Sequence, residues 1–301
     1  MNRADGYRIE SNDYIYQAIP HVMDRRYDAS NYMDLEIDID SLQSYINGWR
    51  KKGVGLSYMA VIIAAYIRTA AKYPYLNRFI MNKRIYARNH FSITFVTLKA
   101  GEMEETAVKL YFNLDEDIFE INQKINDAIE FNRKEETANS TDKLLKVVFR
   151  IPGLVRGVVN LLKFVDKHFT LPFFLIDAIP FHTSFFITNL ASIRLNSIYH
   201  HIYEFGTTSI FLSMGQTTKK VVRNGDGFTE KKVMPMKIVT DERIASGNYY
   251  GKCFREFQKY MANPELLETK AETINRDPDI IKKNPKFFVK EKFVKDEVKN
   301  G

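Results

Sequence analysis

Cysteine is almost absent from this chain of 301 residues, in which Cys253 stands alone. A lone cysteine excludes an internal disulfide and is typical of a reducing compartment, so we expect a cytoplasmic protein. No apolar run reaches the ~18 to 20 residues that a membrane-spanning helix needs. The N-terminal stretch MNRADGYRIESNDY is too polar for a secretory signal peptide. The sequence therefore excludes a secreted disulfide scaffold and an integral membrane protein.

Broad basic charge and metal-ligand patterns are also missing. The formal net charge is +7, but residues 142–168 contribute six Lys or Arg against two Asp, and residues 270–301 contribute nine against six acids. The remainder is neutral, which argues against a broad nucleic-acid-binding face. No cysteine or carboxylate pair lies at ligand spacing from a histidine, so we expect neither a metal nor a tightly bound cofactor. The histidines considered for a metal site are His21, His90, His168 and His182.

Helical and strand periods alternate along one continuous order. Hydrophobic residues make up 45% of the chain, enough for a large core. In YMDLEIDIDS the apolar residues occupy every second position from Met33 to Ile39, the period of a strand with one buried face. The sequence predicts helices over 40–53, 57–73, 115–131 and 249–267, with Ser57 as the candidate cap of the second. Strands are expected at 79–89 as a hairpin, and at 90–98, 105–112, 184–190, 208–215 and 233–240.

Several phrases in this order resemble one enzyme family. YDASNYMDLEIDIDSL, SFFITNLASI, SIFLSMGQ and VMPMKIVTDERIASG look like successive blocks of the catalytic domain of the 2-oxoacid dehydrogenase acyltransferases, and more distantly of chloramphenicol acetyltransferase. The resemblance covers residues 14–268. It implies an α/β two-layer sandwich with a mixed sheet, and a homotrimer with active sites between subunits. It also implies acyl transfer from a thioester such as acyl-CoA to an acceptor.

The stretch TDERIASG departs from the family's His-Arg-x-x-Asp/Asn-Gly signature. Glu242 stands where the family has its general base, and Ser246 stands where an Asp or Asn holds the loop. Arg243 and Gly247 keep the family's types. The resemblance also places the oxyanion-stabilising hydroxyl of the family on Thr188, within FITNLAS. A site with these residues would retain the oxyanion donor and replace the histidine with a carboxylate.

Two functional hypotheses follow. In the first, Glu242 is the base of an active acyltransferase whose acceptor is an amine or a thiol, because a carboxylate activates an alcohol poorly. In the alternative, the protein is a catalytically inactive relative that acts as a trimeric binding or regulatory protein, at a membrane surface in one version. A displaced base is a further alternative, since His200 and His201 in YHHIYEFG imitate the signature's spacing. Against it, this phrase lies between two blocks where the family has a connecting segment.

The expected domain organisation has three parts. Residues 1–13 are predicted as an N-terminal extension, 14–268 as the acyltransferase-like domain and 269–301 as a flexible basic tail. No lipoyl or subunit-binding domain is seen before residue 14, so we expect a stand-alone protein outside the multienzyme complexes. Within the domain, 142–178 is predicted as a hydrophobic, basic helical insertion divided at Pro152. It either packs on the domain or on a neighbouring subunit, lies on an anionic membrane surface, or covers a lipid-like acyl chain.

Two further features are assigned structural roles. Cys253 lies on a helix beside core-facing aromatic residues, which predicts a packed thiol rather than a nucleophile. The glycines of RNGDGF predict a hairpin turn, because a strand follows where a phosphate-binding loop needs a helix.

Overall fold

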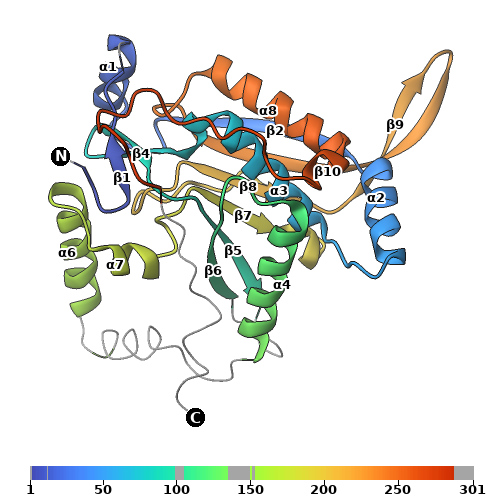
Figure 1. Ribbon diagram of the computed structural model, residues 1–301, viewed down its shortest axis with the longest axis horizontal. Helices are drawn as coiled ribbons and strands as arrows, with labels where there is room; N and C mark the ends of the chain where they lie inside the picture. The colour runs from blue at the N-terminus through green and yellow to red at the C-terminus, as the bar shows by residue number, and fades with distance from the viewer. Residues whose placement is uncertain (1, 12, 99–104, 135–149, 151–152, 288–301) are drawn as a thin grey trace.

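The computed structural model describes residues 2–11, 13–98, 105–134, 150 and 153–287 (Figure 1). Its centre is a seven-stranded mixed sheet with the order β2-β10-β8-β7-β5-β6, to which β9 adds by pairing with β10. Strand β7 runs parallel to β5 and to β8, and the other neighbours are antiparallel. The strands are β2 Ser30–Asp38, β5 Ser92–Leu98, β6 Glu105–Tyr111, β7 Phe185–Asn189, β8 Ile210–Met214, β9 Thr218–Asn224 and β10 Gly227–Asp241.

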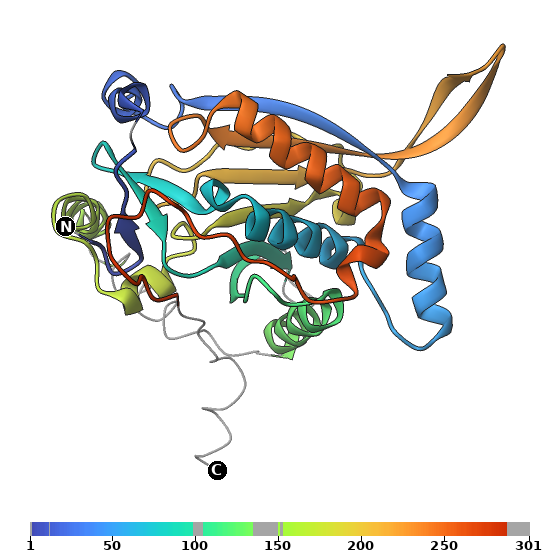
Figure 2. The same cartoon turned by 45° about the horizontal axis from the view of Figure 1, so that its top comes forward.

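Helices cover one face of this sheet (Figure 2). The central one, α3, buries eleven of its fifteen residues because its sequence is apolar on nearly every side. Its first turn is capped by the Ser57 hydroxyl, as the sequence predicts. The predicted α/β two-layer architecture is confirmed, with the large core between helices and sheet. These helices are α2 Ile39–Lys51, α3 Tyr58–Lys72, α4 Ile118–Lys134 and α8 Gly247–Ala262.

The opposite face of the sheet is covered in part by an irregular segment, residues 194–209. A smaller cluster lies beneath it, made of Phe186, Phe211 and Val239 from three strands and Ile202 from the segment. The Ser213 hydroxyl bonds to the backbone N–H and C=O of Ile198, which fixes the segment to the sheet. We call this the open face, because no described helix packs across it (Figure 2).

The first residues of the chain belong to the fold, which corrects the prediction of an extension over 1–13. Strand β1 (Gly6–Arg8) joins β4 (Arg84–Arg88) and β3 (Arg78–Met81) in a three-stranded sheet of order β1-β4-β3. Gly6 is required there, because a Cβ atom would lie 2.8 Å from the Ala87 carbonyl oxygen. Helix α1 (Tyr14–Val22) follows. The expected hairpin is confirmed, with positive φ angles at Asn82 and Lys83.

The described part of the insertion forms α6 (Leu154–His168) and α7 (Phe173–Ala178). The division at Pro152 falls outside the described residues. Helix α7 is fixed to the sheet by Lys109, whose Nζ donates to the carbonyl oxygens of Ile176 and Ile179 at 2.7 and 2.6 Å. Helix α6 lies at the edge of the molecule (Figure 1). Short 3₁₀ turns complete the elements at Pro74–Asn77, Leu190–Ile193 and Pro264–Leu267.

The beginning of the predicted flexible tail is also built into the fold. The buried guanidinium of Arg78 makes two hydrogen bonds, of 2.6 and 2.7 Å, to the Asp277 carboxylate and a further one to Asp279. Ile280 bridges to Ile9. Residues 269–287 are therefore held by long-range contacts that the local composition did not signal, while 288–301 lie outside the described residues.

Candidate active site

The loop after β10 is fixed by a buried ion pair. Asp241 and Arg243 face each other through two hydrogen bonds of 2.8 and 2.7 Å, and both side chains are buried. Arg243 Nη1 also donates to the carbonyl oxygens of Met23 and Asp24. Burial opposes the charged form of Arg243, but the hydrogen bonds that it donates to the Asp241 carboxylate, and the negative charge of that group, outweigh burial and raise the pKa of Arg243. Arg243 therefore has a structural role, and its partner Asp241 was not predicted from the sequence.

Glu242 lies between these two residues in the chain. Its backbone N–H donates to the Ala29 carbonyl oxygen at 2.8 Å, which joins the loop to the start of β2. The side chain is half-buried. Within the part of the chain that the structure describes, no residue forms an ion pair or hydrogen bond with its carboxylate. A fixed backbone thus carries an unpaired carboxylate.

Ser246 and Gly247 begin helix α8. The Ser246 hydroxyl accepts from the Tyr249 N–H at 3.2 Å and is the N-cap of the helix. The space beside Gly247 is open, since an added Cβ would meet nothing within 4 Å in this chain. The hydroxyl of Ser246 therefore holds the helix start directly, whereas nothing in one subunit requires a glycine next to it.

Thr188 lies far from Glu242 within one chain. Thr188 pairs with Ser213 on β8, and Ser213 pairs with Lys237 on β10. Glu242 is five residues beyond Lys237, which corresponds to roughly 16 Å along the strand direction. Two strand spacings of about 4.8 Å separate them sideways. The two predicted catalytic residues therefore cannot act on one substrate atom unless they come from different subunits.

His200 lies nearer to Thr188. Its ring stacks on Phe211 with centroids 4.1 Å apart, on the open face. Phe211 pairs with Phe186, two residues before Thr188, so Phe211 and Thr188 are diagonal neighbours about 7 to 8 Å apart. His200 Nδ1 lies 2.9 Å from the His201 carbonyl oxygen. Partial burial lowers the pKa of His200, so its neutral form persists to lower pH.

The remaining candidate base and two features with predicted structural roles lie in different surroundings. His201 is exposed on the irregular segment. Cys253 is buried in the core, and burial raises the pKa of its thiol to about 12, which confirms a packed thiol. The turn at Gly225 joins β9 to β10, which confirms the hairpin of RNGDGF. Among the described residues, no cluster of histidine, cysteine and carboxylate side chains could hold a metal ion.

A buried polar cluster around His182 and Asp166 was not predicted from the sequence. His182 lies with its Nδ1 3.2 Å from the Thr207 hydroxyl and its Nε2 3.5 Å from the Asp166 carboxylate. The same Asp166 pairs with Arg3 at 2.6 Å, and Arg3 pairs with Asp5 at 2.9 Å. These residues come from the N-terminus, α6 and the approach to β7. Their separation in sequence left no local pattern to find.

Comparison with known proteins now gives the relationship. Residues 182–269 match the family model of the 2-oxoacid dehydrogenases acyltransferase (catalytic domain). No curated protein sequence matches the chain. The matched stretch includes Thr188 and the loop that carries Glu242, so it contains both halves of the site predicted from the resemblance.

Solved structures of acyltransferases share the fold across the chain. A probable dihydrolipoamide acetyltransferase from Listeria monocytogenes superposes with a TM-score of 0.56 at 15% identity, covering 84% of this chain and 94% of the other. The dihydrolipoamide acetyltransferase of Azotobacter vinelandii gives 0.56 at 13% identity, with coverages of 86% and 93%. A chloramphenicol acetyltransferase gives 0.51 at 11% identity, with coverages of 85% and 99%. The predicted fold class is confirmed.

Proposed function

We propose that the protein transfers an acyl group from a thioester such as acyl-CoA to an amine or thiol acceptor, as a homotrimer with sites between subunits. The observation that carries this proposal is the Glu242 carboxylate. It is unpaired among the described residues, while the loop around it is fixed by the buried Asp241–Arg243 pair. A base needs both a free carboxylate and a defined position.

The chemistry suits a carboxylate when the acceptor is an amine. The amine nitrogen attacks the thioester carbonyl carbon, and the resulting oxyanion accepts a hydrogen bond from the Thr188 hydroxyl. Glu242 takes a proton from the ammonium that forms. The C–S bond then breaks, and the proton passes to the leaving thiolate, so that an amide and a thiol are the products and the carboxylate is regenerated.

The separation of Thr188 and Glu242 within one chain supports a site between protomers. Thr188 is half-buried at the open face, and Glu242 lies at the far end of β10. In the Azotobacter vinelandii enzyme, catalysis was studied through a serine, a histidine and an asparagine, the last two being four residues apart. Glu242 and Ser246 have the same spacing. This agreement supports placing Glu242 at the position of the base.

His200 is the second candidate for the base, and one specific observation favours it. Its stacking partner Phe211 is a diagonal neighbour of Thr188 on the same sheet face. If Nδ1 donates to the His201 carbonyl oxygen, Nε2 keeps its lone pair. This arrangement would give a site whose base and oxyanion donor come from one chain.

The test is turnover of a panel of acyl-CoA thioesters with amine and thiol acceptors. We expect Glu242→Gln to lower kcat/KM by about 10²- to 10⁴-fold, the usual effect of a general base. Glu230→Gln, on the exposed β9–β10 hairpin, is the matched control and should leave kcat/KM unchanged. Activity that survives Glu242→Gln but is abolished by His200→Ala would move the base to His200. Absence of both turnover and CoA binding would favour the non-catalytic binding protein.

A further inference from the structure

Helix α6 presents an apolar strip to the surface instead of burying it. Leu161 and Phe164 are 61% and 53% exposed, and Leu154, in the first turn of the helix, is 36% exposed. Their spacing of seven and three residues places them on one side of the helix. Phe169, 66% exposed, extends the strip beyond the helix end, where its ring centroid lies 6.2 Å from that of Phe164. Phe174, on α7, is 68% exposed. Single exposed apolar residues are ordinary, but a contiguous set marks an interaction surface.

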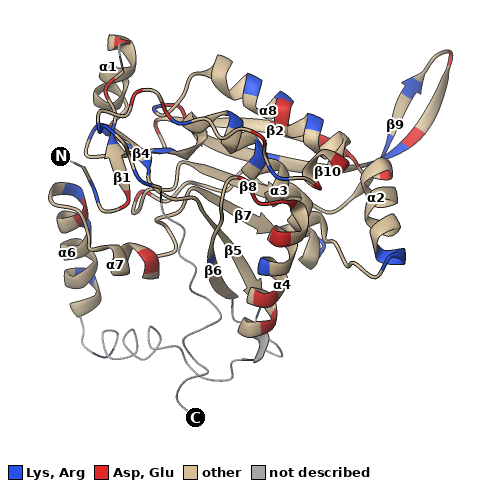
Figure 3. Ribbon diagram, in the orientation of Figure 1, with Lys and Arg blue, Asp and Glu red and all other residues tan. Residues whose placement is uncertain are grey.

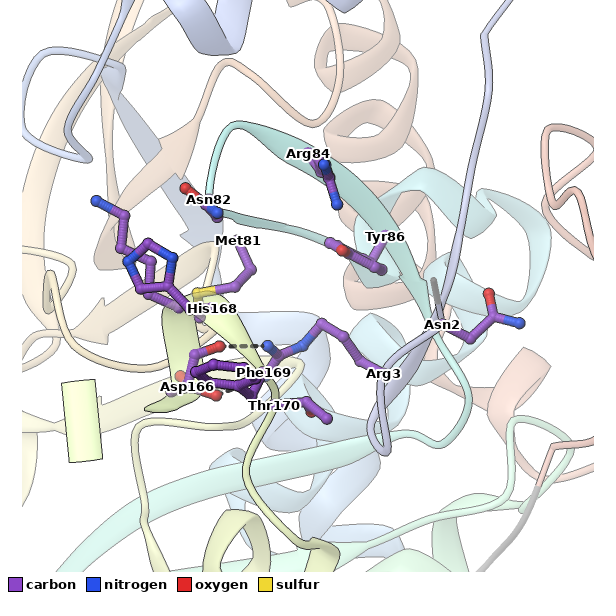
Figure 4. Close-up of a pocket in the computed structure, with 11 residues that line it drawn as sticks. Asn2, Arg3, Met81, Asn82, Arg84, Tyr86, Asp166, His168, Phe169 and Thr170 are labelled. Carbon is purple, nitrogen blue, oxygen red and sulfur yellow. Dashed lines mark hydrogen bonds and ion pairs between the residues drawn. The ribbon is translucent and has the colours of Figure 1, made fainter. Parts of the chain in front are cut away.

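The orientation of α6 is fixed by a charge. Asp166 is the buried residue of this helix. Its carboxylate accepts a 2.6 Å bond from Arg3 Nη2, and its backbone carbonyl accepts one of 2.8 Å from Nη1 (Figure 4). Because a broken buried ion pair costs several kcal/mol, the helix cannot easily rotate to cover the strip. The exposed side is therefore a stable feature of the subunit.

Cations flank the strip on α6, and the exposed carboxylate of Asp24 lies near one of them, Lys167. Arg156, Lys163 and Lys167 are exposed, and their spacing of seven and four residues places them on one side of α6. Figure 3 shows Lys or Arg colour on this helix. The one carboxylate between residues 153 and 176 is Asp166, which is buried. An apolar strip beside lysine and arginine is typical of helices that lie in the surface of an anionic bilayer.

The basic surface continues onto the neighbouring hairpin. The last turn of α6 and the β3–β4 turn line a small cavity of about 50 Å³, and its lining includes Lys167. His168 and Arg84 lie on opposite sides of this cavity (Figure 4). The Arg84 side chain is exposed at this rim. The positive region is thus wider than one helix, as a flat anionic surface would require.

We infer that α6 and the adjoining Phe169 and Phe174 dock the protein on an anionic phospholipid membrane, with the helix parallel to the surface. None of the helices in the described ranges is long and apolar enough to cross a bilayer. A second copy of the same strip is a poorer occupant, because a symmetric contact would bring the cations of two subunits together.

Vesicle sedimentation of the full chain tests this inference. Binding should be strong to vesicles of equal parts phosphatidylcholine and phosphatidylglycerol, and weak to phosphatidylcholine alone. The double variant Lys163→Gln/Lys167→Gln should lower the affinity by roughly fivefold per lysine. Lys252→Gln/Arg255→Gln on exposed positions of α8 removes the same charge elsewhere and should have no comparable effect.

A second pair of double variants tests the apolar strip. Leu161→Ser/Phe164→Ser should lower binding at least about tenfold, because each side chain loses apolar burial in the bilayer. Val221→Ser/Phe228→Ser on the β9–β10 hairpin, where exposure is 63% and 78%, should not. Equal recovery of the unmodified protein with and without anionic lipid would overturn the inference. So would a loss of oligomeric mass in the strip variant with vesicle binding intact, because the strip would then be a subunit contact.

Discussion

At the scale of single residues, the Asp241–Arg243 pair is predicted to stabilise the loop that carries Glu242, whereas the Glu242 side chain is not. We expect Arg243→Met to lower the free energy of unfolding by about 3 kcal/mol, because the buried Asp241 carboxylate loses two short hydrogen bonds and keeps only Arg26, at 3.9 Å, as a cationic partner. Glu242→Gln, one residue away, should leave stability unchanged because its carboxylate has no partner among the described residues. Urea denaturation of both variants makes the comparison, and a stable Arg243→Met protein would contradict it.

Buried His182 predicts a pH dependence of stability. Burial holds its folded-state pKa well below the ordinary value of 6.5. As pH falls below about 6.5, the unfolded chain takes up a proton that the folded chain resists, so stability falls. The contribution of Asp166 to the pH dependence has the opposite sign. Burial raises the pKa of its carboxyl group above 3.8, so the folded chain takes up this proton before the unfolded chain does, at lower pH.

The variant His182→Gln should flatten this dependence between pH 6.5 and 5.5. One proton corresponds to a slope of up to about 1.4 kcal/mol per pH unit. Buried His90 shares the direction of the shift and should preserve part of the slope. Urea midpoints at both pH values measure the change, and an identical slope in the two proteins would show that His182 does not cause it.

At the scale of elements, Ser246 is the cap that starts α8. Ser246→Ala should cost about 1 kcal/mol of stability, because the Tyr249 N–H loses its acceptor. Ser246→Asp should restore that stability, since an aspartate caps a helix as well as a serine does. Thermal unfolding of both variants is the measurement, and equal loss in the two would mean that capping is not the role of this side chain.

The segment 269–287 packs against the three-stranded sheet β1-β4-β3 and should stabilise it, like a strap. A chain that ends at residue 269 lacks Asp277 and Asp279, which leaves the buried Arg78 guanidinium without its carboxylates. We expect it to unfold at lower urea concentration, by about 3 to 5 kcal/mol. A chain that ends at residue 287 is the control and should match the full-length protein. Equal stability of the two truncations would disprove the strap.

At the scale of the whole molecule, the register of the sheet predicts complementation between subunits. Glu242→Gln and Thr188→Val should each be nearly inactive alone. When the two are mixed and allowed to exchange subunits, random assembly gives about a quarter of the sites one intact Glu242 and one intact Thr188. Activity should therefore return in the mixture. The pair His200→Ala and Thr188→Val distinguishes the alternative, because a site within one chain gains nothing from mixing.

Secondary-structure elements could be predicted from the sequence, but long-range side-chain contacts could not. The alternation from Met33 to Ile39 is enough to predict β2, and the Ser57 cap to predict the start of α3, because these patterns depend on neighbouring residues. The roles of Arg3 and Asp277 depend on partners more than 160 residues away in sequence, at Asp166 and Arg78. No local pattern marks such pairs, so the two chain ends were predicted as an extension and a tail.

The sequence by itself determined the order of most strands and helices, because periodicity is a local property. Its resemblance to the acyltransferases led to the predicted fold class and to the residues expected at catalytic positions. The tertiary structure decided which of these residues can meet. The register of β7, β8 and β10 separates Thr188 from Glu242 and brings His200 near Thr188. It also decided that the apolar strip of α6 faces outward, since the Arg3–Asp166 ion pair fixes the helix and a hydrophobic period alone cannot say which side is covered.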